Sequence, residues 1–226
     1  MRLLVLGKGK TGSLVAQVAQ QRRHHVEVLT GADNANACAL TPGRLQGIDV
    51  VVDFTGPQAV LANIAACLRA RKHMVVGTTG WHDSLSEVRR DVAAAGTGFL
   101  YAVNFSIGVN LFLEAARAAA EAVKQGYLPQ IFERHHAQKK DAPSGTALVL
   151  REVVRTVSSE TPEIISFREG DVVGMHELVF DSINDRIYLC HDAKSRRGFA
   201  EGAVRGAEWV ALRKGFFCFR DVWREL

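Results

Sequence analysis

The stretch R-L-L-V-L-G-K-G-K-T-G, from Arg2 to Gly12, decides the fold that we expect for the rest of the chain. Its apolar run is typical of a buried strand, and apolar residues then recur at helical spacing over residues 13–20. Between a strand and a helix, G-x-G-x-x-G is the dinucleotide-binding fingerprint. In it, Gly7 makes the turn, Gly9 lets the backbone approach a pyrophosphate and Gly12 lets the helix pack on the strand. We therefore predict a nucleotide site here.

A methyl group added at Gly9 or at Gly12 is expected to impair nucleotide binding while leaving the fold largely intact, because each glycine makes room for a neighbour. All six residues of the loop are candidate cofactor contacts: Gly7, Lys8, Gly9, Lys10, Thr11 and Gly12.

The adenosine end of the cofactor is expected beyond the second predicted strand, His25 to Leu29. The fingerprint places an acidic residue about 20 residues past the glycines, where it binds the ribose. Asp33 is the nearest candidate, although a solvated turn position is an equal alternative for it. Lys8 and Lys10 are placed to meet a 2′-phosphate instead. The sequence thus predicts NADH or NADPH and does not choose between them.

Three further runs predict parallel strands at residues 49–55, 73–76 and 98–102, and a helix is expected over residues 57–71. Open α/β sheets bind ligands at the carboxyl ends of their strands. We therefore expect the polar turns after the first two of these strands to line the cofactor cleft with Thr55, Gly77, Thr78 and Thr79.

The pattern changes after Asn104. An alanine-rich helix over residues 108–124 leads to a strand at 130–136 and a helix at 144–158. Strand-like runs follow at 163–167, 172–180 and 186–191 without helices between them, which suggests a mixed or antiparallel sheet with one face free to assemble an oligomer. A last helix and strand, 199–212 and 216–219, could return to the first domain.

These patterns together predict an α/β fold, in which a Rossmann-like doubly wound parallel sheet is joined to a smaller α+β domain with a mixed or antiparallel sheet. We expect a dinucleotide-binding domain over residues 1–105, completed by 196–226, and a substrate-binding and oligomerisation domain over 106–195.

The stretch E-R-H-H-A-Q-K-K-D-A-P-S-G-T, from Glu133 to Thr146, concentrates proton carriers and anion binders. Its end is typical of a helix start, with Asp141 or Ser144 as the cap, and the amides of the first helical turn attract an anion. A carboxylate of a small substrate could rest on Gly145 and Thr146. The rest of that substrate could meet further cations of the stretch, namely His136 and either Lys139 or Lys140. The alternative is a solvated polar loop before an ordinary helix.

This stretch resembles the signature loop of the dihydrodipicolinate reductases, E-x-H-H-x-x-K-x-D-A-P-S-G-T, at every fixed position. The segments D-F-T, G-T-T-G and A-x-N-F-S of that family also occur in order, and the resemblance extends from Gly7 to Asp221. It implies hydride transfer from NADH or NADPH to dihydrodipicolinate or its hydrated tetrahydro precursor. The product would be tetrahydrodipicolinate, on the route to diaminopimelate and lysine.

The resemblance also implies roles for single residues. His135 and Lys139 would donate protons, whereas His136 would bind a carboxylate together with Ser144, Gly145 and Thr146. The nicotinamide half of the cofactor would be surrounded in addition by Ala102, Val103, Asn104 and Phe105. A homotetramer is expected, as in the family.

Composition narrows the partners. The net charge is +4 with a pI near 9.0, but the basic residues are scattered, so a small dicarboxylate substrate explains them and nucleic acid is not expected. The four cysteines (Cys38, Cys67, Cys190 and Cys218) lack C-x-x-C spacing, which favours a reducing cytoplasm. The first residues are too short for a signal peptide and no apolar run reaches membrane-spanning length.

No metal site is expected, because His24, His25, His73 and His82 lack the spacing of metal ligands. His176 and His191 lie on predicted strands, where packing or hydrogen bonding is the expected role.

Two alternative functions remain open at this point. Another two-domain amino-acid or imino-acid dehydrogenase would share the glycine loop but would not need H-H-x-x-K before D-A-P-S-G-T. A homologue that only senses NAD(H) is the second alternative, and the intact His135 and Lys139 argue against it.

Overall fold

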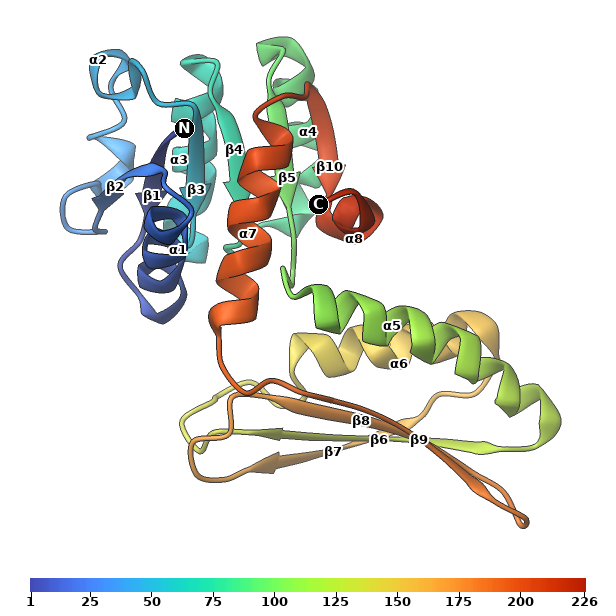
Figure 1. Cartoon of the computed structure of the whole chain (residues 1–226). Coiled ribbons are helices and arrows are strands. Elements are labelled where there is room, and N and C mark those ends of the chain that lie inside the picture. The colour runs from blue at the N-terminus through green and yellow to red at the C-terminus, as the bar shows by residue number, and fades with distance from the viewer. The chain divides into compact units, whose positions relative to one another are not determined.

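The computed structural model describes all residues from 1 to 226, which form two compact units (Figure 1). Unit 1 comprises Met1–Ser106 and Arg196–Leu226, and unit 2 comprises Ile107–Ser195. No helix is both long and apolar enough to span a lipid bilayer.

Unit 1 is built on a parallel sheet of six strands in the order β10-β5-β4-β3-β1-β2. The strands are β1 (Arg2–Leu6), β2 (His25–Leu29), β3 (Val50–Asp53), β4 (His73–Val76), β5 (Gly98–Tyr101) and β10 (Gly215–Cys218). The central strands are continuous apolar runs because helices cover both faces of the sheet. This arrangement confirms the predicted Rossmann-like sheet.

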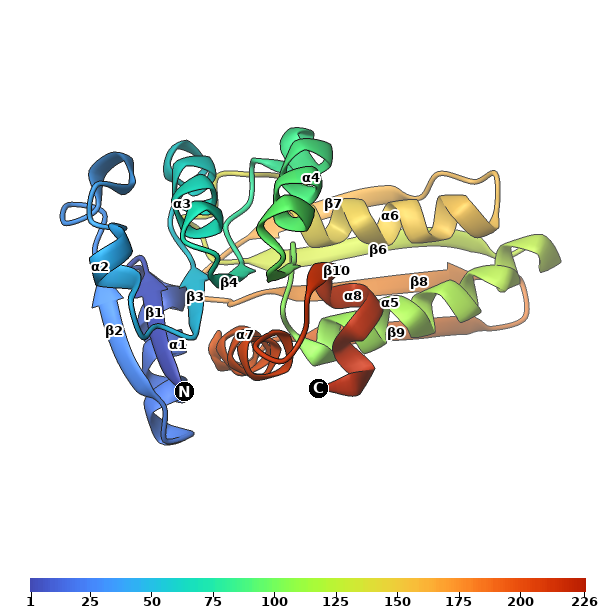
Figure 2. The same cartoon turned by 90° about the horizontal axis from the view of Figure 1, so that it is seen from above.

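The helices of unit 1 form two layers. Helices α1 (Lys10–Gln21) and α7 (Arg197–Val210) cover one face of the sheet, and α3 (Pro57–Arg69) and α4 (Leu85–Ala95) cover the other (Figure 2). The remaining pieces are short: α2 (Pro42–Leu45), α8 (Phe219–Val222), and the 3₁₀ turns η1 (Ala35–Ala37), η2 (His82–Ser84) and η4 (Trp223–Glu225).

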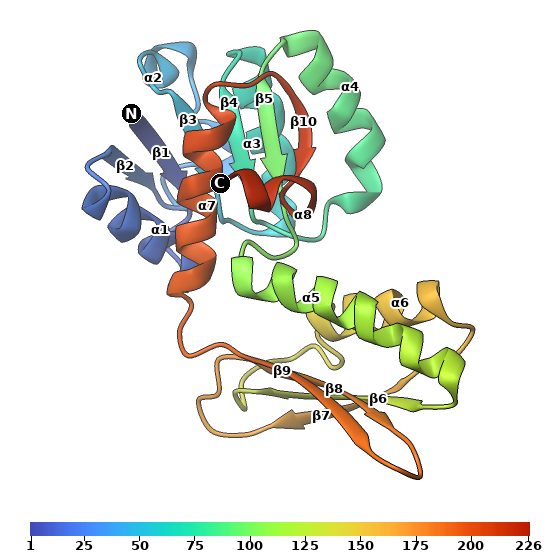
Figure 3. The same cartoon turned by 45° about the vertical axis from the view of Figure 1, so that its right-hand side comes forward.

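Unit 2 contains a mixed sheet in the order β7-β6-β8-β9, in which only the pair β6 and β7 is parallel. Its strands are β6 (Leu128–His135), β7 (Glu163–Arg168), β8 (Met175–Asp181) and β9 (Arg186–Asp192). Helices α5 (Ile107–Ala119) and α6 (Gly145–Val157) lie side by side on one face (Figure 3), and a 3₁₀ segment, η3 (Ala120–Gln125), follows α5. The other face carries no helix of unit 2.

Two local details differ from the expected elements. The long alanine-rich helix ends its α-helical part at Ala119 and continues as 3₁₀ turns to Gln125, where Gly126 takes a left-handed conformation with φ of 86°. The strand expected from Val172 begins only at Met175. Neither difference moves a candidate site residue out of its element.

The turn after β1 shows why its glycines are needed. Gly7 has φ of 97°, a left-handed value that disfavours a side chain. A Cβ at Gly12 would lie 2.2 Å from the carbonyl oxygen of Gly7, whereas a Cβ at Gly9 would meet nothing within 4 Å. A methyl at Gly12 would therefore strain the turn as well as crowd the helix, because the added atom would collide with backbone.

We predict that the variants Gly9→Ala and Gly12→Ala separate in thermal unfolding. Gly12→Ala should cost about 1–3 kcal/mol through overpacking, which lowers the Tm by roughly 5 °C. Gly9→Ala should unfold within about 2 °C of the parent protein, because its methyl group meets open space. Differential scanning calorimetry measures both, and equal Tm values for the two variants would contradict this account of the turn.

Candidate active site

A hollow of about 300 Å³ lies at the carboxyl ends of the central strands of unit 1. It brings together three turns that are far apart in the sequence. Its lining consists of Gly9, Lys10, Thr11, Gly12, Phe54, Thr55, Pro57, Gly77, Thr78 and Thr79. Gly7 is buried beneath this surface and Lys8 is exposed beside it.

Helix α1 directs its amino terminus into this hollow. Gly9 is the residue before the helix, and the first intrahelical bond runs from Ser13 N to its carbonyl oxygen. The amides of the first turn therefore have no partner within the helix, and no side chain caps them. No acidic residue lies in the first turn, so the positive end of the helix dipole is available to a phosphate. The site thus fits the pyrophosphate of a dinucleotide.

Asp33 lies in the turn after β2, where its carboxylate is already engaged. The Thr30 hydroxyl donates to it at 2.5 Å, and this hydrogen bond lowers the pKa of Asp33. The positive charges of Arg44 and Lys8 act on it in the same direction. The carboxylate is exposed. The expected adenosine end therefore combines an acidic side chain, Asp33, with the positive charges of Lys8 and Arg44.

The four residues after β5 divide by exposure. Ala102 and Phe105 are buried, and the Phe105 ring packs against Phe54 and Phe219. Val103 is exposed, and the side chain of Asn104 accepts a hydrogen bond from the backbone N–H of Ser106 at 2.8 Å. The side chains of Ala102 and Phe105 thus belong to the core of unit 1, and none of these four residues lines the hollow.

The sequence analysis did not single out Asp53, the last residue of β3. This carboxylate is fully buried, and the hydroxyl groups of Thr55 and Thr78 both donate to it at 2.7 Å. The floor of the hollow is therefore held by a side chain that no ligand can reach directly.

In unit 2, the loop between β6 and α6 is organised by Glu133, a carboxylate with no solvent exposure. Both of its oxygens accept from the backbone N–H of Ser144 at 3.1 Å, and one accepts from Ser166 and from Arg168 at 2.7 Å. Burial alone raises the pKa of Glu133, but the hydrogen bonds from Ser144, Arg168 and Ser166 outweigh it and lower that pKa to about 2. The carboxylate is therefore ionised near pH 7.

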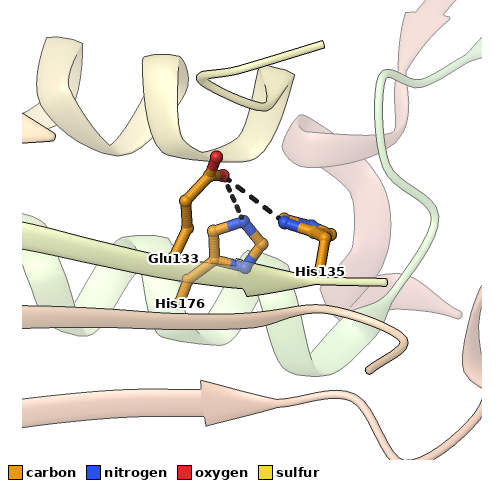
Figure 4. Close-up of side chains that lie close together, drawn as sticks. All are labelled: Glu133, His135 and His176. Atoms are coloured by element: carbon orange, nitrogen blue, oxygen red, sulfur yellow. Dashed lines mark ion pairs between the residues drawn. The ribbon is translucent and has the colours of Figure 1, made fainter. Parts of the chain in front are cut away.

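Two histidine rings flank this carboxylate (Figure 4). His135 Nδ1 lies 3.6 Å and His176 Nε2 lies 3.7 Å from the same oxygen of Glu133, and the two rings meet edge to face. Burial, which outweighs the attraction of Glu133, lowers the pKa of each histidine to about 4. Both rings are therefore neutral near pH 7. His176 Nε2 also lies 3.1 Å from the hydroxyl of Ser144.

Ser144, not Asp141, is the residue that caps α6. Its hydroxyl accepts from the backbone N–H of Ala147 at 3.3 Å. Asp141 instead holds Lys139, whose Nζ lies 2.8 and 2.9 Å from the two carboxylate oxygens. This ion pair lowers the pKa of Asp141 against the opposing effect of burial.

The remaining predicted site residues of the loop differ in exposure. His136 and Lys139 are half-buried, whereas Lys140 is exposed. Gly145 is exposed and Thr146 half-buried in the first turn of α6. The loop thus gathers a half-buried ammonium group, imidazole rings and open helix amides.

Glu133, His135 and His176 also form a group whose ligand atoms lie within 4.8 Å of one another, a grouping that histidine spacing did not reveal. Arg168 already neutralises the carboxylate at 2.7 Å, and Ser144 contacts both His176 and Glu133. A cation in this position would have to displace these contacts, so the arrangement is better suited to hydrogen bonding than to metal binding. His191, the other strand histidine, packs its ring against Phe112.

A phosphate-binding glycine turn on a parallel sheet and a loop rich in proton donors define a class of protein, the nicotinamide-dependent oxidoreductases of two-domain form. Comparison with known proteins narrows the class. Residues 1–105 match the family model described as dihydrodipicolinate reductase, N-terminus, and residues 108–223 match the one described as dihydrodipicolinate reductase, C-terminus. The chain belongs to the dihydrodipicolinate reductase family, and it is an NAD(P)H-dependent oxidoreductase.

Relatives agree over most of the chain. A 4-hydroxy-tetrahydrodipicolinate reductase from Laribacter hongkongensis is 39% identical over 86% of this chain and 83% of its own length. A 4-hydroxy-tetrahydrodipicolinate reductase from Christiangramia forsetii is 35% identical over 100% of this chain and 99% of its own length. Among solved structures, the dipicolinate-bound dihydrodipicolinate reductase from Paenisporosarcina sp. TG-14 has a TM-score of 0.78 at 24% identity, covering 98% of this chain and 99% of that one. This likeness shows the shared fold.

The fold extends to other dehydrogenases. The amine dehydrogenase from Mycobacterium smegmatis has a TM-score of 0.64 at 8% identity, covering 98% of this chain and 95% of that one. At such low identity only the architecture is shared.

We predict that His135 titrates near pH 4 in the ligand-free protein, because burial disfavours its charged form. A dianion bound beside the ring should raise the midpoint, since a nearby negative charge favours imidazolium. The measurement is NMR titration of the histidine ring signals, with His135→Asn used for assignment. A midpoint at the ordinary value of 6.5 in the ligand-free protein would contradict the structure.

Proposed function

We propose that this enzyme transfers a hydride from NADH or NADPH to dihydrodipicolinate or 4-hydroxy-tetrahydrodipicolinate. The product is tetrahydrodipicolinate, in the biosynthesis of diaminopimelate and lysine. The observation that carries the proposal is the loop from Glu133 to Thr146, which has every fixed residue of the family pattern and is held in place by buried hydrogen bonds. The names of the relatives support the same reaction.

The first turn of α6 is the proposed carboxylate site. Gly145 and Thr146 offer backbone amides at the positive end of the helix dipole, and Ser144 fixes that end through its contact with Glu133. His136, half-buried in the same loop, supplies a further donor. A small dicarboxylate would meet amides and an imidazole ring within one segment of chain.

Proton donation is assigned to His135 and Lys139. The nicotinamide, when bound, supplies the hydride, and the carbanion or enamine that the reduced substrate becomes must then take a proton. Lys139 carries one on Nζ, held by Asp141. His135 is neutral in the ligand-free protein. The charge of a bound dianion would raise its pKa, so we expect the ring to take up its second proton when the substrate binds.

The preference between NADH and NADPH depends on the side chains at the expected adenosine end of the cofactor site. Asp33 offers a carboxylate to ribose hydroxyl groups, whereas Lys8 and Arg44 bring positive charge to the same carboxylate. Acidic and basic groups together favour use of both NADH and NADPH. Comparing the kcat/KM values of the two cofactors tests this.

The uncovered face of the unit 2 sheet is the proposed contact between copies of a homotetramer. It bears a hollow of about 620 Å³ and exposed apolar side chains, among them Leu128, Phe167 and Tyr188. Charges of both signs lie on it, including the ion pair of Arg186 with Asp181, so the surface can complement a second copy of itself.

The four free cysteines and the biosynthetic role favour a cytoplasmic location.

We predict a mass near four chains of 24.7 kDa by light scattering at micromolar concentration. Phe167→Asp should lower that mass, because it places a charge within the contact. The matched substitution Leu212→Asp, at a residue that is 85% exposed in unit 1, should not. A monomeric mass for the parent protein would rule out the tetramer.

We predict that the two proposed groups of residues separate in steady-state kinetics. Lys139→Ala and His135→Ala should lower kcat by about 10²-fold, because a proton donor acts in the transition state. His136→Ala should chiefly raise KM for the dicarboxylate. The assay follows loss of NADH or NADPH absorbance with freshly generated substrate.

The exposed neighbour Lys140 provides the matched comparison for Lys139. Lys140→Ala should keep kcat within about 2-fold, because its side chain lies outside the ion pair with Asp141. If His135→Ala and Lys139→Ala kept the parental kcat and changed only KM, the loop would bind carboxylates and the proton would come from elsewhere. If the parent protein did not reduce this substrate, the proposed reaction would be wrong.

A further inference from the structure

We propose that a buried polar network of Asn34, Asn63 and Asp53 positions the cofactor pocket and makes the Thr55 hydroxyl an acceptor for a hydrogen-bond donor of the cofactor. Such a donor is a ribose hydroxyl or the carboxamide N–H. This inference rests on the proposed use of a nicotinamide cofactor. None of the three network residues lines the hollow itself.

Asp53 is the centre of the network. Its Oδ1 accepts from the backbone N–H of Thr55 at 2.9 Å and from the hydroxyls of Thr55 and Thr78 at 2.7 Å. Its Oδ2 accepts from Asn63 Nδ2 at 2.8 Å. Four donors thus converge on a side chain with no solvent exposure, and a buried carboxylate is tolerated only with such partners.

The network reaches the turn after β2. Asn63, on α3, accepts from Asn34 Nδ2 at 2.9 Å, and Asn34 in turn accepts from the backbone N–H of Ala39 at 3.2 Å. Asn34 follows directly after Asp33, the candidate at the adenosine end, and both asparagines are buried. One chain of hydrogen bonds therefore connects the turn after β2 with the turns after β3 and β4.

The direction of these hydrogen bonds fixes what the two threonines can offer. A carboxylate only accepts hydrogen bonds, so each of the two hydroxyls donates its single proton to a hydrogen bond with Asp53. Thr78 also accepts from the backbone N–H of Thr55 at 2.8 Å, and it is buried. Thr55 is half-buried and lines the hollow. Its oxygen accepts only a long contact from Asn63 Nδ2 at 3.5 Å, which leaves a lone pair for a donor of the ligand. The pocket therefore favours a ligand that donates a hydrogen bond to the oxygen of Thr55.

Exchanging the donor and the acceptor of the hydrogen bond between Asn63 and Asp53 tests the network. Asp53→Asn turns an amide N–H₂ toward the N–H₂ of Asn63, and Asn63→Asp sets two carboxylates against each other. Either change should raise the Kd for NADH by about 10-fold or more, because buried polar groups lose their partners. The double variant Asp53→Asn with Asn63→Asp restores a donor facing an acceptor, so its Kd should return to within about 3-fold of the parent value.

Val60→Ala is the matched control. Val60 is fully buried on the same helix as Asn63 and lies outside the network. The substitution should lower the Tm, as a cavity does, and leave the Kd for NADH unchanged. Calorimetric titration gives the Kd, and the KM for cofactor should rise in the single variants while the KM for the dicarboxylate stays within about 2-fold.

A second pair carries the test if a single variant does not fold. Thr55→Ser keeps the acceptor and should bind NADH as the parent does, whereas Thr55→Val removes it and should bind about 10-fold more weakly. The proposal is overturned if Asp53→Asn and Thr55→Val both bind NADH with the parental Kd. It is also overturned if the double variant binds no better than the single ones, or if Val60→Ala weakens binding as much as they do. A parent protein that binds neither NADH nor NADPH would overturn the proposed function as well.

Discussion

One buried charge, the carboxylate of Glu133, determines the geometry of the candidate substrate site. An unpaired carboxylate in this position would cost several kcal/mol, so the chain must surround it with donors. The donors are three residues from two elements: Ser144 at the start of α6, and Ser166 and Arg168 on β7. Satisfying the charge therefore fixes the start of α6 relative to the sheet, and with it the amides proposed to bind a carboxylate.

The same principle recurs in unit 1, where Asp53 is buried at the end of β3. There the donors are Thr55, Thr78 and Asn63. In both units a fully buried carboxylate at or near the end of a strand holds the adjoining turn, and the turn presents the groups that face a ligand. The candidate substrate and cofactor sites are thus both held by buried carboxylates that have no solvent exposure.

The sequence predicted those parts of the structure that depend on local pattern. The glycine turn, the parallel strands and the start of α6 follow from spacing and from capping rules, and the signature loop identified the family. The collision at Gly12 could not be predicted, because its neighbour in space is the carbonyl of Gly7, a distance that depends on how tightly the turn closes.

The supporting residues could not be predicted in the same way. Arg168 reaches Glu133 because β7 pairs in parallel with β6, and His176 reaches it because β8 pairs on the other side in a register that sets it opposite Glu133. Strand order and register are not visible in one sequence. Glu133 itself was a signal, since a charged side chain on a strand beside the apolar residues Ile131 and Phe132 requires partners if it is buried. The lowered pKa of His135 likewise depends on burial, which the motif does not report.

The most direct measurement of this account is hydrogen exchange of the Glu133→Gln variant, with Glu160→Gln at an exposed position just before β7 as the control. Glutamine keeps the shape of the side chain and removes the charge that Arg168 and Ser144 share. We expect faster exchange over residues 136–147 and weaker binding of dipicolinate in Glu133→Gln, with unchanged protection in β6 and β8, and no change in the control. Parental exchange in the loop together with parental dipicolinate affinity would contradict the claim that Glu133 holds the site in place.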